Sequence, residues 1–586
     1  MKRTHMCGLV DASLAGETVT LQGWVQRTRD RGSILFVLLR DREGIVQITF
    51  DQEKCAPEVF EAGKACRGEY VLEVTGLVAL RDEAAINDKM KTGYVEVFAQ
   101  SATILNKAQT PPIYIDDDHP DESESVRLKY RYLDLRRASL QETLRLRHRV
   151  QSAIRAQLDE GGFTEIETPI LTKSTPEGAR DFLVPSRVQQ GSFYALPQSP
   201  QIYKQLTMLA GMDRYYQIAR CFRDEDNRAD RQPEFTQLDL EMSFVEESDV
   251  QEQIEGIWKR VLHDVFSIDH PFPLPRVTWT DAMNLYGSDK PDRRFGLELV
   301  DITALKEGCG FSVFEGAREV RGINAKGCAA KLSRKEIDAL GEYVKTYRAK
   351  GLAWIVVEEG GVRSPIAKFI PEEKMNAIVA AMGGEAGDVL FFVADRRAVV
   401  LQALGNLRCE IARRLDMIDH DKLDLFWVTE FPMFEWNEET EQFDAMHHPF
   451  TASMPEDEEK VERSELGEVR ARAYDLVLNG IEMGSGSIRI HDGTIQARTF
   501  DLLGLSKEEV EHRFGFLLEA FRYGVPPHGG FAFGVDRMMM MLLNKDSLRD
   551  VIAFPKAQNG SCLMMETPSD VSADQLAALG LQAGQE

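Results

Sequence analysis

The sequence predicts a multidomain α+β protein: a small N-terminal β-barrel, a larger domain built on an antiparallel sheet, and an α/β domain inserted into the larger one. Three observations lead to this prediction. The first 105 residues alternate apolar and polar positions in short runs. From residue 163 onward strand-like segments rich in aromatic and polar residues predominate, and between 293 and 420 they give way to Gly/Ala-rich strands and helices. At 586 residues the chain has room for several domains of roughly 100–200 residues each.

The chain is acidic overall, with a formal net charge of −25. An even spread of that charge would disfavour a nucleic-acid partner, but residues 127–155 hold nine Lys/Arg against two Asp/Glu. A local basic patch can bind phosphates within an acidic protein. A solvated helix face gives the same pattern, so charge alone does not decide between the two.

We expect a soluble, cytoplasmic protein without a membrane partner. The sequence has no apolar run near the roughly 18 residues that a membrane span requires. Its start, MKRTHMCGLVDASLAGETV, lacks the apolar core of a secretory signal. The eight cysteines are scattered without a CxxC pair, so reduced and mostly buried thiols are expected rather than a disulfide framework.

Residues 1–105 are predicted to form a barrel of about five strands. Their alternating runs are TVTLQGWVQ, SILFVLLR, GIVQITF, YVLEVTGLV and YVEVFAQ, with turn-like segments between them. A small barrel at the start of a long chain favours the oligonucleotide-binding (OB) fold, which holds single-stranded bases, although other small barrels share the pattern. Residues 106–137 follow as a hinge, which includes the polar stretch TPPIYIDDDHPDESES.

The larger domain is predicted in two parts, residues 138–292 and 421–558. A helix opens the first part, because apolar residues keep a helical spacing up to the stop at Gly161-Gly162: Leu140, Leu144, Ile154 and Leu158. Strand-like segments follow: FTEIETPIL, GSFYALPQ, RYYQIARCF and EFTQLDLEMSF. Strands rich in polar and aromatic residues are typical of an antiparallel sheet. They return in LDLFWVTEFPMFEW, GSGSIRI and GGFAFGVDR.

Residues 293–420 separate these two parts and are predicted to form the inserted domain. Segments such as EIDALGEYVKTYRAKGLAWIVV lack the clustered Arg, Gln and Glu of the flanking parts. Residues 559–586 are small and polar, and we expect them to pack on the surface as a C-terminal extension. No chemistry can be assigned to the inserted domain.

The segment from Arg220 to Asp239, RCFRDEDNRADRQPEFTQLD, carries the strongest functional signal. Two strand-like halves flank a charged loop, which predicts a hairpin with a polar tip. Arg and Glu together with strand-borne Phe, Gln and Asp favour the floor of a ligand site. A hairpin that is charged only for solubility is the alternative.

FRDED and RQPEFTQLD in this hairpin resemble motif 2 of the class II aminoacyl-tRNA synthetases, in the form shared by the aspartate, asparagine and lysine enzymes. FTEIETPIL, with Pro169, resembles motif 1, which builds the family's dimer, and HGGFAFGVDRMMMMLL resembles motif 3. LPQSPQIYKQL, TPEGARDF and MHHPF extend the likeness to the bacterial aspartate enzymes nearly throughout the chain. The resemblance implies a homodimeric aspartate-tRNA ligase that uses ATP and Mg²⁺ and charges tRNA(Asp) through an aspartyl-adenylate.

The resemblance also implies which residues act on ATP. Arg223 would contact the α-phosphate, and Arg537 would hold the γ-phosphate and lie over the adenine, whose other face meets Phe235; a planar, charged guanidinium suits both tasks. Asp475 and Glu482 would bind Mg²⁺, with ordinary exposed charge as the alternative for both. The implied catalytic set is Arg223, Glu225 and Arg537. The ATP-binding set adds Asp224, Gln232, Phe235, Glu482, Gly534, Val535 and Asp536.

For the amino acid, Lys204 and Arg489 would face the side-chain carboxylate of aspartate, and Asp239 would balance Lys204. Asparagine has nearly the same shape, so a charged receptor is needed to exclude it. The implied aspartate set is Glu177 on a closing loop, Gln201, Lys204, Arg223, Asp239, His447, His448 and Arg489. A protonated imidazole of the histidine pair could sense the carboxylate. A metal site there is disfavoured, because adjacent histidines alternate sides on a strand.

In the barrel, Phe36 and Gln47 fall where the family stacks and reads the middle anticodon base, and Glu96 falls where it reads the first. An aromatic platform beside hydrogen-bonding groups is how single-stranded RNA is read. Without the resemblance, Phe36 would be interpreted as a core residue. The anticodon backbone would meet three further residues, Arg27, Arg29 and Arg31.

Three alternatives stay open. A relaxed enzyme would charge both tRNA(Asp) and tRNA(Asn); the loops near Arg31 and residues 84–87, which lack the Leu and Lys of strict enzymes, favour this form slightly. A non-catalytic tRNA-binding paralogue is disfavoured by the intact motif residues. An asparagine-tRNA ligase is disfavoured by the large insertion and by Lys204.

Overall fold

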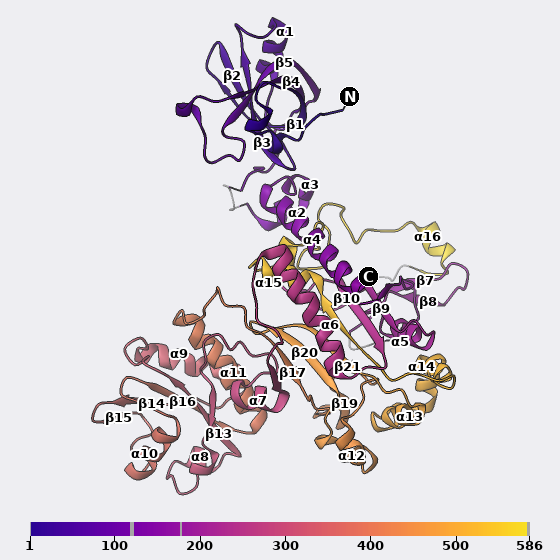
Figure 1. Cartoon of the computed structure of the whole chain (residues 1–586). Helices are drawn as coiled ribbons and strands as arrows, with labels where there is room; N and C mark the ends of the chain where they lie inside the picture. The colour runs from indigo at the N-terminus through magenta and orange to yellow at the C-terminus, as the bar shows by residue number, and fades with distance from the viewer. Residues whose placement is uncertain (1, 118–121, 176–178, 583–586) are drawn as a thin grey trace. The chain divides into compact units, whose positions relative to one another are not determined.

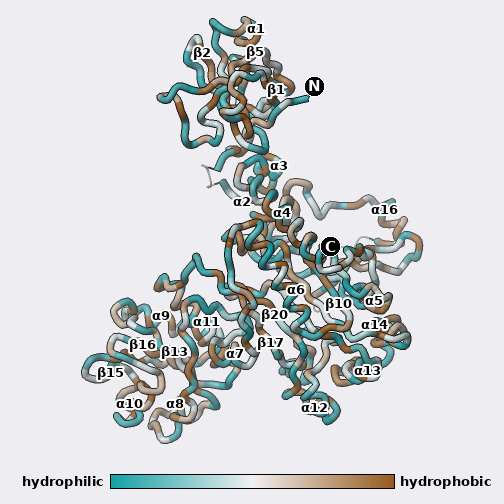
Figure 2. The backbone as a smooth tube through the Cα atoms, in the orientation of Figure 1, coloured by the Kyte–Doolittle hydropathy of each residue, from teal (hydrophilic) through white to brown (hydrophobic). Residues whose placement is uncertain are grey.

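The computed structural model describes residues 2–117, 122–175 and 179–582 (Figure 1). The chain forms two compact units. The first comprises Met1–Arg149, Asp226–Pro233 and Met539–Gln575, and the second comprises Val150–Glu225, Glu234–Met538 and Leu576–Glu586. No helix in these described ranges is long and apolar enough to cross a lipid bilayer. Helix α4 (Ala138–Glu160) mixes hydrophilic and hydrophobic residues along its length (Figure 2).

The first unit begins with a closed five-stranded barrel, as the alternating pattern predicts. Its strands are β1 (Thr18–Asp30), β2 (Ile34–Asp41), β3 (Gly44–Asp51), β4 (Val71–Leu80) and β5 (Val95–Asn106), in the order β1-β2-β3-β5-β4. Helix α1 (Pro57–Ala65) connects β3 to β4. Alternate residues point inward along each strand, so that Leu35, Val37 and Leu39 of β2 are buried in the barrel core. The β1–β2 turn uses Gly32 with φ +83°.

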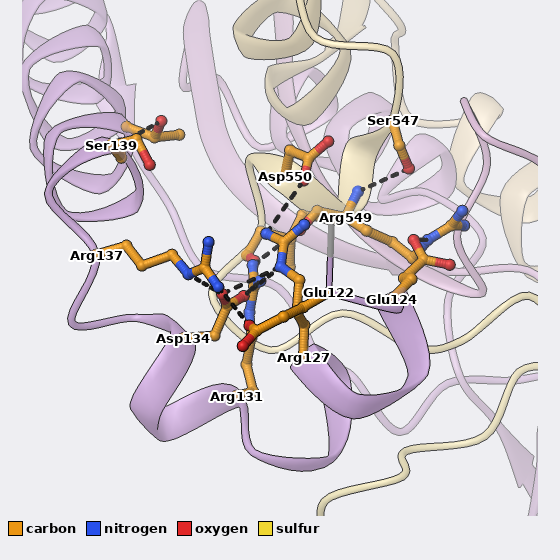
Figure 3. Close-up of polar contacts among 12 residues, drawn as sticks. Glu122, Glu124, Arg127, Arg131, Asp134, Arg137, Ser139, Ser547, Arg549 and Asp550 are labelled. Carbon is orange, nitrogen blue, oxygen red and sulfur yellow. Dashed lines mark hydrogen bonds and ion pairs between the residues drawn. The ribbon is translucent and has the colours of Figure 1, made fainter. Parts of the chain in front are cut away.

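Two short helices, α2 (Glu124–Lys129) and α3 (Arg131–Asp134), lead from the barrel into α4. Their centre is Asp134, which is fully buried and forms ion pairs with Arg127 (3.1 Å), Arg131 (2.6 Å) and Arg137 (3.0 Å; Figure 3). Arg131 also donates to the backbone carbonyls of residues 549, 552 and 553, at 2.8–2.9 Å. The cluster thus fastens the hinge helices to a segment more than 400 residues later in the chain.

Replacing Asp134 with Asn should lower the free energy of unfolding by about 3–5 kcal/mol, because three largely buried guanidinium groups lose their carboxylate. Urea unfolding would measure the change. Glu142→Gln is the matched control, since it removes only the exposed pair with Arg145 and should cost less than about 1 kcal/mol. Equal effects of the two substitutions would show that the Asp134 cluster does not hold this unit together.

The second unit is built on an eight-stranded sheet in the order β11-β17-β20-β21-β22-β10-β9-β6. The sheet is antiparallel except for the two outermost pairs, β6–β9 and β11–β17. The strands are β6 (Thr164–Glu165), β9 (Arg214–Phe222), β10 (Glu234–Ser243), β11 (Arg276–Thr278), β17 (Leu425–Thr429), β20 (Ala473–Leu478), β21 (Ile481–Ile488) and β22 (His528–Gly534). Helix α6 (Glu247–Arg260) packs across the sheet (Figure 1), where its Trp258 meets Phe533 and its Glu255 accepts from Trp427 Nε1 at 2.9 Å.

A five-stranded antiparallel sheet forms the inserted region, in the order β12-β13-β16-β14-β15. Its strands are β12 (Leu299–Asp301), β13 (Glu319–Ala325), β14 (Ala353–Glu358), β15 (Gly361–Arg363) and β16 (Val389–Asp395). Helices α9 (Arg334–Lys345) and α11 (Arg397–Arg414) build the core on one face. Helices α8 (Ser312–Glu315) and α10 (Glu372–Ala381) build the core on the other. Because helices cover both faces of this sheet, its strands are largely apolar.

Two predicted strands are shorter than their sequences indicate. FTEIETPIL forms only β6, which ends at Glu165; after Pro169, which cannot donate to a ladder, Ile170 and Leu171 are 48% and 51% exposed. GSFYALPQ forms only β8 (Phe193–Ala195), which pairs with β7 (Leu183–Pro185). The remaining elements are α5 (Gln201–Leu209), α7 (Trp279–Tyr286), β18 (Phe434–Asn437), β19 (Gln442–Ala445), α12 (Glu458–Glu462), α13 (Gly493–Leu502), α14 (Lys507–Phe521), α15 (Val535–Leu542) and α16 (Ala573–Ala578).

Candidate active site

Four charged side chains meet where helix α5 packs on the sheet: Lys204, Asp239, Glu241 and Arg489. Each is at most 2% exposed. Lys204 Nζ donates to Asp239 Oδ1 at 2.6 Å and lies 3.5 Å from Glu241 Oε2. Arg489 Nε donates to Glu241 Oε1 at 2.9 Å. Two buried cations therefore face two buried carboxylates, which is the condition under which such charges are tolerated.

Burial raises the pKa of Asp239 to about 6, against the opposing attraction of Lys204. Burial acts in the same direction on Glu241, but Arg489 and Lys204 outweigh it and hold the pKa of Glu241 below its usual value. The second oxygen of Asp239, Oδ2, and the side-chain Nε2 of Gln201 are buried without a hydrogen-bond partner in the described part of the chain. A polar ligand beside the cluster could satisfy both atoms.

Glu241 is a member of this cluster that sequence reasoning missed. Asp239 and Glu241 lie two positions apart on β10, so both side chains point to the same face of the sheet. The alternation in LDLE was the available signal. The prediction that Asp239 balances Lys204 agrees with the geometry, whereas Arg489 is paired with the carboxylate that was overlooked.

His447 and His448 both join the cluster from the loop after β19. His447 Nδ1 lies 3.3 Å from Ser485 Oγ, and His448 Nε2 accepts from Arg489 Nη1 at 2.7 Å. The pair does not form part of a strand, so the expectation that its rings point to opposite sides is wrong. The expectation of a protonated imidazole is also wrong: burial lowers the pKa of His447 to about 4, and burial with the charge of Arg489 lowers that of His448 well below its usual value.

The buried neutral His447 should make the protein acid-sensitive. As pH falls through the usual histidine value of 6.5, the unfolded chain takes up a proton that the folded chain accepts only near pH 4. Stability is therefore lost between these values, by roughly 3 kcal/mol for this group. In urea unfolding at pH 7 and pH 4.5, His447→Gln should lose less stability on acidification than the parent. His420→Gln, at an exposed position, should match the parent; identical losses in all three proteins would contradict the assignment.

A second group of residues lies where β9 and β22 end and the antiparallel β10 begins. The Arg223 guanidinium lies 5.1 Å from the centre of the Phe235 ring, and no described hydrogen bond or ion pair holds it. Asp536 accepts from the backbone N–H of Thr236 at 2.7 Å, which fixes the start of α15 against β10. Arg537 Nη1 donates to the carbonyl of Glu482 at 2.8 Å. The junction of β22 and α15 thus brings residues 534–537 to the Arg223 side of the sheet.

The structure gives fewer contacts for the other residues that were predicted to bind ATP. Glu225 is half-buried, and Asp224 lies 3.8 Å from Arg180. Gln232 belongs to the first unit, where its side-chain amide exchanges hydrogen bonds with the backbone of Lys556. Glu177, which was predicted for the aspartate site and not for the nucleotide site, lies outside the described residues.

Asp475 and Glu482 lie on the adjacent strands β20 and β21. Asp475 is only 6% exposed, so the interpretation as ordinary surface charge is wrong for this residue. Burial and the nearby Glu482 raise the pKa of Asp475 well above its usual value, and its Oδ1 atom has no described hydrogen-bond partner. Two carboxylates with an open oxygen fit Mg²⁺, which keeps few protein ligands and takes the rest from phosphate and water. Among the described residues no group of three His, Cys, Asp or Glu could hold a metal.

In the barrel, the predicted RNA-contacting residues lie on the outer face. Phe36 is half-buried between the inward-pointing Leu35 and Val37, and in the strand register it pairs with Arg29 of β1. The interpretation of Phe36 as a core residue is therefore wrong. Gln47 Nε2 donates to Glu96 at 3.2 Å. The three arginines on or just after β1 are exposed: Arg27, Arg29 and Arg31.

Comparison with protein families identifies the class. Residues 123–558 match the family model described as tRNA synthetases class II (D, K and N), and residues 19–105 match the OB-fold nucleic acid binding domain. The chain therefore belongs to the class II tRNA synthetases of the D, K and N type.

Individual relatives are similar over the whole chain. An aspartate-tRNA(Asp/Asn) ligase of Symbiobacterium thermophilum is 56% identical, over 99% of this chain and 100% of that protein. An aspartate-tRNA(Asp/Asn) ligase of Bacillus cytotoxicus is 53% identical over 99% of both chains. An aspartate-tRNA ligase of Macrococcus caseolyticus is 53% identical over 99% of this chain and 98% of that protein.

Solved structures share the fold at low identity. The asparaginyl-tRNA synthetase of Pyrococcus horikoshii, complexed with asparaginyl-adenylate, is 18% identical with a TM-score of 0.59, covering 95% of this chain and 98% of that one. The asparaginyl-tRNA synthetase of Entamoeba histolytica, also with asparaginyl-adenylate, is 17% identical with a TM-score of 0.57, covering 94% and 98%. The predicted fold class is confirmed by these matches and by the sheets described above.

Proposed function

We propose that this protein is an aspartate-tRNA ligase, which activates L-aspartate with ATP and transfers it to tRNA(Asp). The buried charge cluster carries the proposal. Lys204 and Arg489 are buried cations paired with two buried carboxylates, and Asp239 and Gln201 each keep a buried polar atom without a partner among the described residues. The side-chain carboxylate of aspartate could accept charge-assisted hydrogen bonds from both cations, which are stronger than the bonds that the neutral amide of asparagine would accept. Relatives named for aspartate, at more than half identity over nearly the whole chain, support the same substrate.

In the first step, the α-carboxylate of aspartate attacks the α-phosphorus of ATP, the bond to the bridging oxygen breaks, and pyrophosphate leaves. The substrate is its own nucleophile, so the protein positions the reactants and neutralises charge. Arg223, which lies over Phe235 and has no hydrogen-bond or ion-pair partner among the described residues, suits the α-phosphate, and Arg537 suits the γ-phosphate end. Mg²⁺ held by Asp475 and Glu482 would neutralise the phosphates. In the second step a terminal ribose hydroxyl of the tRNA displaces AMP from the aspartyl group.

Aspartate-dependent exchange of labelled pyrophosphate into ATP tests the first step. We expect exchange with aspartate and much less with asparagine. Folded protein that shows no exchange would favour the non-catalytic tRNA-binding paralogue. Equal exchange with asparagine would favour the asparagine-tRNA ligase.

Charging of tRNA(Asn) as well as tRNA(Asp) is part of the proposal. The barrel loops near Arg31 and residues 84–87 lack the Leu and Lys expected of a strict enzyme, and two of the relatives are named for both tRNAs. Aspartylation of each purified transcript decides the point. Product on tRNA(Asp) alone would restrict the protein to one tRNA.

Replacing Phe36 with Ala should weaken tRNA binding without affecting adenylate formation. The half-buried outer ring beside Gln47 and Glu96 offers a stacking platform for one base, and such stacking contributes about 1–3 kcal/mol. The KM for tRNA should rise roughly tenfold to a hundredfold. Phe98→Ala, which removes another half-buried ring on β5, is the control for general damage to the barrel. An unchanged KM for tRNA, or a loss of pyrophosphate exchange, would contradict the proposed role.

The same proposal covers the chain's organisation. Residues 1–105 would bind the anticodon, 106–137 act as a hinge, 138–292 and 421–558 form the catalytic domain around the insertion 293–420, and 559–586 extend it. A homodimer would form through the motif 1 region, whose Ile170 and Leu171 are exposed apolar side chains. The protein would act in the cytoplasm. Sedimentation of the purified chain measures the assembly.

A further inference from the structure

Lys290 lies against the metal-binding pair although neither its sequence context nor the chemistry above assigns it a role. Its Nζ atom lies 3.4 Å from Glu482 Oε2 and 3.8 Å from Asp289 Oδ1. The side chain is 45% exposed, and that of Glu482 is 35% exposed, so both can move without unpacking the core. Lys290 belongs to the segment that leads from α7 into the inserted domain.

This segment is anchored to the strand pair that carries the two carboxylates. Arg293 forms a two-pronged ion pair with Asp424, at 2.8 and 2.9 Å, and its guanidinium lies 3.6 Å from the centre of the Phe426 ring. Asp424 in turn donates its N–H to the side chain of Asn479, in the turn between β20 and β21, at 2.8 Å. The entry to the insertion is thereby held beside the turn that separates Asp475 from Glu482.

Gly480 in the same turn shows how closely the two segments approach. Its φ of +84° favours glycine, and an added Cβ would lie 2.9 Å from the Cβ of Asp292. The backbone that carries Lys290 is thus fixed within two residues of the lysine. Only the side chain is free to change partners.

Charge balance defines what that side chain can do. Asp475 has a buried oxygen without a described partner, and the Lys290 ammonium is the positive group on Glu482. A divalent cation bound by Asp475 and Glu482 would repel the ammonium from its present position. The phosphates that accompany the cation supply new anionic partners at once. Lysine, a compact charge on a flexible stem, is suited to such an exchange.

We propose that Lys290 is a displaceable counter-cation: it holds Glu482 in the absence of nucleotide, yields it to Mg²⁺, and then contacts the terminal phosphates of ATP. The proposal rests on the proposed function, since it needs a nucleotide at this site. The segment that leads into the inserted domain would then take part in ATP binding. A lysine with a purely structural role would not change its partner.

The full-length protein with Lys290→Met tests this exchange through two binding measurements. Without nucleotide, Mn²⁺ binding followed by its electron spin resonance should tighten roughly tenfold, because no ammonium competes for Glu482. Binding of ATP with Mg²⁺ in equilibrium dialysis should weaken roughly tenfold, because a phosphate contact is lost. Lys290→Arg keeps the charge and should bind ATP within about threefold of the parent.

The control is Lys335→Met, which removes an exposed lysine of the inserted domain and should change neither affinity. Opposite shifts in the two affinities of Lys290→Met support the exchange. No shift, or a weakening of both, overturns it, the second outcome being that of structural damage. The parent's aspartate-dependent pyrophosphate exchange is measured alongside. Its absence would refute the proposed function, whereas normal exchange with unaltered binding in Lys290→Met would refute only the role of Lys290.

Discussion

Replacing Arg223 with Leu should lower aspartate-dependent pyrophosphate exchange by about a thousandfold or more, the scale on which a phosphate-stabilising arginine acts. The Arg223 guanidinium lies over the Phe235 ring and has no described hydrogen-bond or ion-pair partner. A permanent cation in that state is available to neutralise charge on the α-phosphate. Since its only described polar contact is with the Phe235 ring, the stability of the protein should change little.

Arg220→Leu is the matched control for this substitution. Arg220 lies on strand β9, just before Arg223, and donates to Glu234 at 2.8 Å and to Thr236 Oγ1 at 3.1 Å. Loss of this surface pair should cost less than about 1 kcal/mol and leave exchange near the parent rate. If Arg223→Leu retained more than about a tenth of the parent activity, a cation that neutralises the reacting phosphate could not lie at this position.

Replacing Lys204 with Met should lower kcat/KM for aspartate by roughly a thousandfold and remove most of the preference for aspartate over asparagine. The ammonium is 2% exposed and is the closest cation to Asp239. A ligand carboxylate beside Arg489 alone would meet half of the present positive charge. The preference is measured by competition between the two amino acids in the exchange assay.

Lys204→Met also leaves the Asp239 carboxyl without its cation, so reduced activity could reflect a damaged fold. The double variant Lys204→Met/Asp239→Asn separates these effects, because it removes both members of the ion pair and should recover stability. It should not recover the preference for aspartate. Recovery of aspartate activity in the double variant would show that Lys204 acts only by neutralising Asp239.

The barrel and the central hairpin were predictable because local pattern and tertiary environment agree there. The strand-like runs SILFVLLR and GIVQITF match β2 and β3, which bury alternate residues over part of their length. RYYQIARCF coincides with β9, and EFTQLDLEMS with β10. The strands of the inserted domain were recognisable by their different composition. Helices cover both faces of their sheet, so these strands are largely apolar.

Other features depend on contacts that a linear pattern does not contain. FTEIETPIL has strand-like composition, yet the chain turns away after two strand residues. The histidine pair sits in a loop that turns both rings toward β21, so the alternation expected of a strand did not apply. Neutral imidazoles follow from burial beside Arg489, which the sequence cannot reveal.

Sequence motifs indicated which residues of the candidate site lie together, but not the partners that come from other segments of the chain. Lys204, Asp239 and Arg489 do lie together. Glu241 lies just beyond the residues of the motif, and Lys290 approaches Glu482 from a segment 192 residues away in sequence, so neither was predicted. Such long-range pairs form only when the sheet is assembled.

Attachment of labelled aspartate to purified tRNA(Asp) transcript, with ATP and Mg²⁺, is the most direct test of the proposed function. We predict aspartyl-tRNA that accumulates only when ATP is present, with AMP and pyrophosphate released in equal amounts. Folded protein that binds the transcript but forms no aspartyl-tRNA would contradict the account.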